Sequence, residues 1–139
     1  MKSLLVAVIF LLALTLIPLG TTSAGQQPNE DNIRITAEAL LAKLNKGEPV
    51  MILDVRTEGQ YKSSGKHIKG DMRLEEAEID TQLKDVPKDK LLVTYCTCPD
   101  EATSGAIADI LREKGFKNVR ALKGGYYAWL RVDGPLEVR

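Results

Sequence analysis

Three short segments typical of strands alternate with helical segments along the chain, and this alternation constrains the fold more than any other feature. They cover residues 50–53, 91–95 and 118–122. Residues 50–53 are a continuous apolar run bounded by turn residues, which is typical of a strand that is buried on both faces, as parallel sheets require. Strands separated by helices predict an α/β fold built on an open, mainly parallel sheet flanked by helices.

The expected helices have recognisable ends. Thr36 is the expected N-cap of a first helix, and Gly47 its C-terminal stop. Residues 102–114 predict an amphipathic helix that ends at Gly115, and its expected apolar positions are Ala106, Ile107, Ile110 and Leu111. Shorter helices are expected over residues 74–83 and after Gly124-Gly125, whereas the glycine-punctuated residues 56–73 predict a long irregular connection.

Residues 1–24 have the composition of an export signal. Lys2 supplies one positive charge, residues 4–19 are apolar except for Thr15 and Pro18, and small residues lead to Ala24 at the expected cleavage point. The apolar stretch is shorter than the roughly 20 residues that span a bilayer comfortably. We therefore expect an extracytoplasmic protein, periplasmic or secreted, with a tether over residues 25–32 and one domain over residues 33–138. An uncleaved N-terminal membrane anchor is the alternative.

The charge balance excludes one large class of partners. The chain has 19 Lys and Arg against 19 Asp and Glu, a formal net charge of zero. No basic excess is available to hold a nucleic-acid backbone, so we expect no nucleic-acid partner. Contact with a membrane is expected only if the N-terminal segment stays uncleaved.

Two cysteines, Cys96 and Cys98, are separated by one residue. A disulfide between them would close a very small ring that rarely accepts the preferred geometry, and it would constrain almost none of the unfolded chain. A structural zinc site lacks ligands, because there is no second cysteine pair and His67 is the one histidine. The pair therefore indicates chemistry rather than structural support, and no metal is expected.

Cys96 follows directly after an expected buried strand and lies shortly before a helix start. Open α/β sheets place ligand sites just outside the carboxyl ends of their strands. There, the amides of a tight loop and of the helix N-terminus form a concave site for an anion. The same environment favours the thiolate, which is the form that nucleophilic cysteine chemistry requires.

Four motifs, in the right order, make the chain similar to the rhodanese-like domain family over roughly residues 33–138. They are Asp54-Val55-Arg56 after the first strand, His67-Ile68-Lys69-Gly70, Tyr95-Cys96 at the head of the active loop, and Gly124-Gly125 with Ala128-Trp129. The resemblance implies the rhodanese-like fold, an open and mainly parallel sheet flanked by helices.

The resemblance also implies a sulfurtransferase. Cys96 resembles the catalytic cysteine that accepts sulfane sulfur as a persulfide and passes it to a nucleophile, in ping-pong covalent catalysis. The implied partners are a small sulfur donor or a protein persulfide and a thiol acceptor, with no cofactor. Asp54 and Arg56 are implied to support the site. The residues implied to bind the outer sulfur are Thr97, Cys98, Pro99, Asp100, Glu101 and Ala102.

The loop departs from the common family pattern in three ways. Pro99 replaces a frequent glycine and removes one amide donor. Glu101, beside Asp100, replaces a frequent arginine. Unit charges about 5 Å apart at an effective dielectric near 20 repel by roughly 3 kcal/mol before screening, so an anionic donor is opposed. Cys98 adds a second thiol. We therefore expect poor use of thiosulfate and a thiol-linked or protein-borne persulfide as the donor.

For each of these residues, a structural role is the alternative to the functional one. Asp100 and Glu101 stand at a helix start, where acids cap amides. Cys98 is either a small buried side chain, a resolving thiol or a redox partner of Cys96. Asp54 and Arg56 are expected to hold the loop, and His67 either orders a loop or acts as a base.

Two other functions stay open: a thiol–disulfide redox module that uses both cysteines, and a non-catalytic rhodanese-like binding domain. A cysteine phosphatase is excluded. Such enzymes need an arginine six residues after the nucleophile, where this chain has Ala102, and residues 97–105 contain no Arg or Lys.

Overall fold

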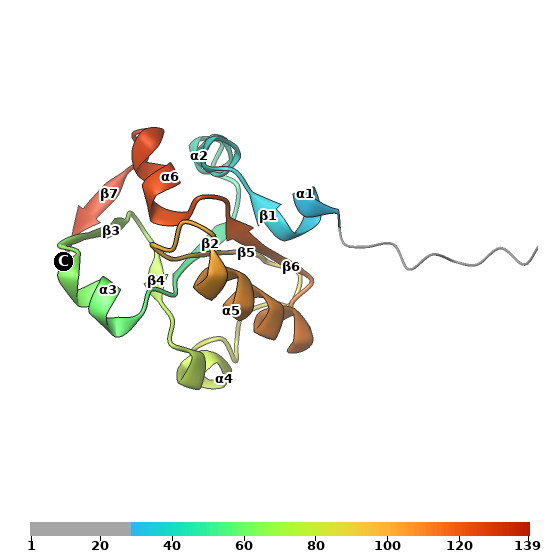
Figure 1. Cartoon of the computed structure of the whole chain (residues 1–139). Coiled ribbons are helices and arrows are strands. Elements are labelled where there is room, and N and C mark those ends of the chain that lie inside the picture. Colours follow the sequence, from blue (N-terminus) through green and yellow to red (C-terminus); the bar gives the residue numbers. More distant parts are fainter. Residues whose placement is uncertain (1–28) are drawn as a thin grey trace, which may run out of the picture.

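The structure is a computed structural model that describes residues 29–139 (Figure 1). The predicted export signal and the first part of the predicted tether lie outside these residues. The last part of the tether contributes to a short helix, α1 (Glu30–Ile33). None of the helices between Asn29 and Arg139 has the length and apolar character needed to span a bilayer.

Five strands form the main sheet, and every pairing in it is parallel. Their order across the sheet is β1 (Arg34–Ile35), β6 (Asn118–Leu122), β5 (Leu91–Tyr95), β2 (Val50–Asp54) and β4 (Met72–Arg73). This confirms the predicted open, mainly parallel sheet. Strand β5 lies in the centre, so the chain leaves the sheet at Tyr95 with neighbours on both sides.

Two hydrophobic cores, one on each face, hold the helices against the sheet. Ile52 and Val93 point into the core under α2 (Ala37–Asn45) and α6 (Gly125–Arg131). The neighbouring residues Leu53 and Leu92 point into the opposite core, under α5 (Ala102–Glu113) and α4 (Ile79–Gln82). Figure 1 shows α2 and α6 above the sheet and α5 and α4 below it. The strands are thus buried on both faces, as their continuous apolar sequences predict.

The predicted helix ends are largely confirmed. The Thr36 hydroxyl accepts a hydrogen bond from the Ala39 amide at 3.2 Å, and Gly47 adopts a left-handed conformation with φ +70° after α2. Helix α5 begins at Ala102 as predicted. Its buried face differs in one position, because Ala106 is exposed and Ala108 is buried instead.

The prediction that residues 56–73 are irregular is wrong. This segment contains α3 (Glu58–Ser63), β3 (Lys66–Ile68) and β4. Thr57 and Gln60 form a capping box at the start of α3, a signal that was present in the sequence. Strand β3 pairs in antiparallel fashion with β7 (Leu136–Val138), the last strand of the chain. The predicted helix over residues 74–83 is divided into a 3-10 turn, η1 (Glu76–Glu78), and α4.

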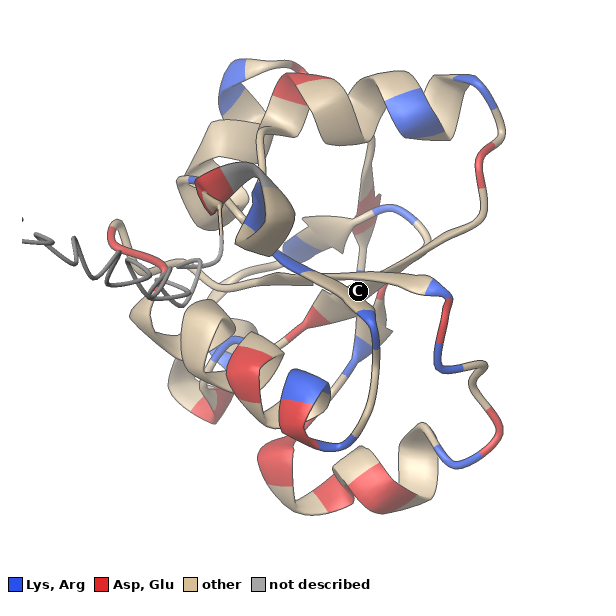
Figure 2. Ribbon diagram, turned by 90° about the vertical axis from the view of Figure 1, so that its right-hand side faces the viewer, with Lys and Arg blue, Asp and Glu red and all other residues tan. Residues whose placement is uncertain are grey.

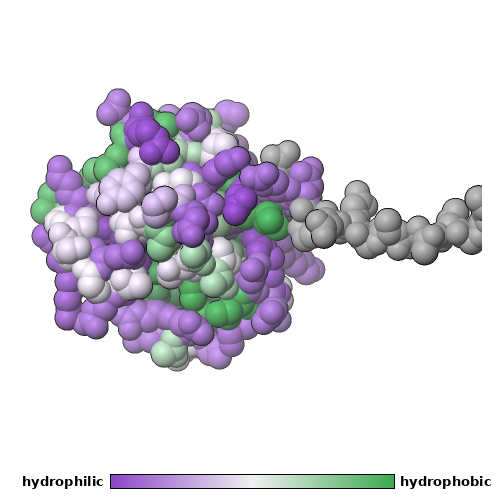
Figure 3. Space-filling view, in the orientation of Figure 1, coloured by the Kyte–Doolittle hydropathy of each residue, from purple (hydrophilic) through white to green (hydrophobic). Residues whose placement is uncertain are grey.

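The surface carries interspersed charges and little contiguous apolar area. Acidic residues gather along η1 and α4, where Figure 2 shows successive red segments. Figure 3 shows hydrophilic residues over most of one face, with apolar residues in small groups.

Candidate active site

Cys96 lies at the point where the chain leaves β5, and α6 holds it there. The Tyr126 amide donates a hydrogen bond to the Cys96 carbonyl at 2.8 Å. A Cβ at Gly125 would stand 2.3 Å from that carbonyl oxygen, so only glycine permits this approach. The Cys96 side chain is completely buried (0% exposed). The Gly124-Gly125 motif therefore has a direct structural role in placing the cysteine.

The Cys96 sulfur faces the N-terminus of α5. The Cys98 amide donates to it at 3.3 Å, the Ser104 hydroxyl lies 3.6 Å away, and the Ser104 amide also donates to it. Burial raises the pKa of the Cys96 thiol above its usual range, although the Ser104 hydrogen bonds act in the opposite direction. The expectation that this site favours a Cys96 thiolate is therefore wrong, because loss of solvation outweighs the donors.

Cys98 is the more acidic of the two thiols. Its sulfur lies 3.4 Å from the Thr103 hydroxyl, and the Gln60 side-chain amide donates to it at 3.9 Å. The Thr103 hydrogen bond lowers the pKa of the Cys98 thiol, and hydrogen bonds from Cys96 and Gln60 act in the same direction. Cys98 is only partly buried. The alternative interpretation of Cys98 as a small buried apolar side chain does not fit these polar contacts.

One amide of the loop that carries both thiols contacts the Cys96 sulfur, that of Cys98, and the Ser104 amide in α5 contacts it as well. The binding of a persulfide's outer sulfur by the amides of residues 97–102 stays a prediction. Asp100 accepts from the Ala102 amide at 3.3 Å, which is the helix-start role expected for an acid. Pro99 has no amide hydrogen to offer.

Glu101 has a structural role that the sequence did not show. It is buried, with a left-handed backbone (φ 56°), and its carboxylate contacts Arg34 at 3.2 Å. The Gly124 amide donates to the same carboxylate at 2.5 Å. Glu101 therefore connects the loop to β1 and to the start of α6, and its charge is neutralised by Arg34. The expected repulsion of an anion is thus reduced to the contribution of exposed Asp100.

Asp54 and Arg56 form a buried ion pair beside the site. The Arg56 guanidinium donates to both carboxylate oxygens of Asp54, the shortest contact being 2.6 Å, and both side chains are at most 1% exposed. The guanidinium also lies over the rings of Tyr95 and Tyr126, at 5.5 and 5.0 Å from their centroids. Tyr95 precedes Cys96, and Tyr126 holds its carbonyl, so the pair supports the residues that position the thiol.

His67 belongs to a second polar cluster. Its Nδ1 lies 2.7 Å from Asp71, and the other Asp71 oxygen accepts a hydrogen bond from the Tyr95 hydroxyl. Burial raises the pKa of Asp71. The cluster ties the turn between β3 and β4 to the central strand, which favours the loop-ordering role of His67.

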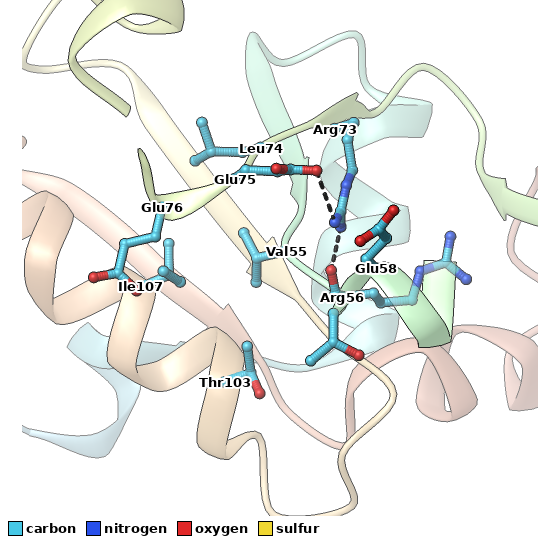
Figure 4. Close-up of a pocket in the computed structure, with 10 residues that line it drawn as sticks. Val55, Arg56, Glu58, Arg73, Leu74, Glu75, Glu76, Thr103 and Ile107 are labelled. Carbon is cyan, nitrogen blue, oxygen red and sulfur yellow. Dashed lines mark hydrogen bonds and ion pairs between the residues drawn. The ribbon is translucent and has the colours of Figure 1, made fainter. Parts of the chain in front are cut away.

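Two cavities are lined in part by side chains that contact the Cys98 sulfur. One, of about 410 Å³, has a polar but uncharged wall that includes Gln60, Thr97 and Tyr127. The other, of about 210 Å³, lies beside Thr103 and Ile107 and is bordered by Glu58, Glu75, Glu76 and Arg73 (Figure 4). Gln60 and Thr103, the two side chains on the Cys98 sulfur, each line one cavity. Over residues 29–139, no three His, Cys, Asp or Glu side chains converge as a metal site.

The chain is similar to a known family and to proteins named as sulfurtransferases. A family model described as "Rhodanese-like domain" matches residues 36–131. A protein named "Sulfurtransferase" from Allochromatium vinosum is 29% identical over 102 residues, which cover 73% of this chain and 92% of the relative. "Thiosulfate sulfurtransferase GlpE" from Coxiella burnetii is 31% identical over 87 residues, which cover 63% of this chain and 78% of the relative.

Solved structures show the same architecture. The Alr3790 protein from Anabaena superposes with a TM-score of 0.63 at 30% identity, covering 76% of this chain and 82% of that one. The BH2092 protein from Bacillus halodurans superposes with a TM-score of 0.65 at 27% identity, covering 78% of this chain and 79% of that one.

Proposed function

The chain belongs to the rhodanese-like domain family, and we propose that it is a sulfurtransferase that carries sulfane sulfur as a persulfide on Cys96 and passes it to a thiol or another nucleophile. The observation that carries this proposal is the position of the Cys96 sulfur. It lies at the carboxyl end of the central strand and at the N-terminus of α5, where the Cys98 and Ser104 amides donate to it and the Ser104 hydroxyl accepts from it. The names of the relatives support sulfur transfer in general.

The reaction proceeds in two nucleophilic steps. The Cys96 sulfur attacks the outer sulfur of the donor, the donor leaves as a thiolate, and Cys96 holds the sulfur as a persulfide. An acceptor thiolate then attacks that outer sulfur and releases Cys96 as a thiolate. The Cys98 and Ser104 amides and the helix N-terminus stabilise negative charge on the sulfur in both steps. These steps use no cofactor.

We propose a thiol-linked persulfide, small or protein-borne, as the donor. Asp100 is an exposed carboxylate on the loop, and three glutamates border the cavity beside Thr103. Arg34, Arg56 and Arg73, which lie near the loop or border that cavity, are already paired with Glu101, Asp54 and Glu75. An anion such as thiosulfate therefore meets negative charge, and these three guanidinium groups are not free to bind it.

Steady-state sulfur transfer tests the proposal. We expect the wild-type protein to catalyse transfer from glutathione persulfide to dithiothreitol, measured as sulfide release, and to use thiosulfate at least about tenfold less efficiently, which corresponds to about 1.4 kcal/mol. Cys96→Ser should lose the activity, whereas Glu113→Gln, an exposed change at the far end of α5, should keep it. Unchanged activity in Cys96→Ser contradicts the proposal.

The closeness of the two cysteines favours a second candidate, a thiol–disulfide module that uses both, because the Cys98 amide lies 3.3 Å from the Cys96 sulfur. We rank it below sulfur transfer because the small ring strains a disulfide. Thiol titration separates the two functions. Reversible loss of both thiols in an oxidising buffer supports the redox module, and persistence of both free thiols excludes it.

A further inference from the structure

The two thiols differ in access from solvent. The Cys96 side chain is 0% exposed, whereas Cys98 is partly exposed. Gln60 and Thr103, which contact the Cys98 sulfur, each line one of the two cavities described above. A donor that arrives from solvent therefore reaches Cys98 before Cys96.

The two sulfurs share one helix N-terminus. The Cys98 amide donates a hydrogen bond to the Cys96 sulfur at 3.3 Å, so the two residues are direct neighbours. The Thr103 hydroxyl lies 3.4 Å from the Cys98 sulfur, and the hydroxyl of the next residue, Ser104, lies 3.6 Å from the Cys96 sulfur. Consecutive residues at the start of α5 thus contact the two sulfurs, so negative charge is stabilised on either one.

We propose that Cys98 is a second sulfur-carrying residue, which takes the outer sulfur of a thiol-linked persulfide at the surface and hands it to buried Cys96. This inference rests on the proposed sulfurtransferase function and specifies how that site is loaded. It assigns to Cys98 direct contact with the transferred sulfur, so Cys98 is a catalytic residue in this scheme.

Each step balances without an oxidant or reductant. In the first step, the Cys98 thiolate attacks the outer sulfur of the donor R–S–SH, the donor S–S bond breaks, and R–S⁻ leaves. In the second, the Cys96 sulfur attacks the outer sulfur, and the bond from that sulfur to Cys98 breaks. The proton of the Cys96 thiol, which the Ser104 hydroxyl accepts before loading, passes to the departing Cys98 sulfur. The outer sulfur keeps its own hydrogen throughout.

The surroundings of the two thiols favour transfer of sulfur from Cys98 to Cys96, and this two-step transfer is called the relay below. A more acidic thiol is the better leaving group in thiol exchange. The Thr103 hydrogen bond lowers the pKa of Cys98, whereas burial raises that of Cys96. Sulfur therefore leaves Cys98 readily and is retained on Cys96, where solvent does not reach it.

Rapid-quench mass spectrometry of the peptide that carries both cysteines tests the relay, with glutathione persulfide as the donor. In the wild type, we expect the extra sulfur to appear first on Cys98 and then on Cys96. Cys96→Ser should accumulate one extra sulfur on Cys98. Cys98→Ser, which keeps a partner for Thr103 and Gln60, should load Cys96 at least about tenfold more slowly, because only the buried, less acidic thiol remains.

The outcomes separate the relay from the proposed function. Wild-type loading of Cys96 together with an unchanged loading rate in Cys98→Ser overturns the relay and leaves the function intact. Failure of Cys96→Ser to take up sulfur, in a protein whose thermal unfolding matches the wild type, also overturns the relay alone. Absence of sulfur from both cysteines of the wild-type protein overturns the function as well.

Discussion

Cys96 and Cys98 are separated by one residue, yet their surroundings drive their acidities apart. Burial dominates at Cys96, and hydrogen bonds to Thr103, Cys96 and Gln60 dominate at Cys98. The sequence predicted the place of Cys96, because a thiol that directly follows a buried strand must lie at the edge of the sheet. It did not predict this difference, which depends on how deeply each side chain is buried and on contacts with Thr103 of α5 and Gln60 of α3.

Alkylation measured against pH tests this difference. We expect iodoacetamide to modify Cys98 with an apparent pKa below the usual thiol value of about 8.5, since the thiolate is the reactive form. Cys96 should react only at higher pH and more slowly, because it is buried and its pKa is raised. Thr103→Val should shift the Cys98 profile to higher pH. A Cys96 that reacts first, or at lower pH, contradicts the assignment.

The buried Glu101 is expected to stabilise the fold through its side-chain contacts. Glu101→Ala removes the contacts with Arg34 and Gly124 and keeps a side chain in a left-handed conformation. We expect a loss of about 2 kcal/mol in the free energy of unfolding, measured with urea. Glu101→Gly loses the same contacts but relieves the backbone, so it should be about 1 kcal/mol more stable than Glu101→Ala. Equal stabilities of the two variants contradict this account of the backbone.

At the scale of elements, the close approach of α6 to the Cys96 carbonyl positions the loop. We expect Gly125→Ala to destabilise the fold by about 1–3 kcal/mol and to reduce sulfur loading, because the new Cβ collides with that carbonyl. The matched control is Gly105→Ala in α5, where a new Cβ meets nothing within 4 Å. It should stabilise the helix by roughly 0.5–1 kcal/mol. Urea unfolding of both variants measures the contrast, and a neutral Gly125→Ala contradicts it.

The sequence predicted those elements that have strong patterns of their own. Strand β2 contains a continuous apolar run, β5 and β6 are largely apolar, and α2 and α5 have periodic apolar faces with stop signals. Strands β1, β3 and β4 are too short to show a pattern. Their positions depend on their partners in the sheets rather than on their own residues. Helix α3 was missed because its apolar face is minimal, so that its capping box was the one local signal.

At the scale of the whole molecule, we propose that the chain is exported. Its first residues have the pattern of an export signal. N-terminal sequencing of the protein from an extracytoplasmic fraction should begin at Gly25, the residue after Ala24. A protein that starts at Met1 and fractionates with membranes indicates an uncleaved anchor instead, and an intact protein in the cytoplasmic fraction contradicts export.

The proposed sulfur transfer requires one covalent species, a persulfide on Cys96 at the carboxyl end of the central strand. Intact-protein and peptide mass spectrometry after equilibration with a thiol persulfide measures it most directly. We predict one additional sulfur retained on Cys96, lost when a thiol acceptor is added and absent from that position in Cys96→Ser. A wild-type protein that retains no additional sulfur on Cys96 with any persulfide donor contradicts the account.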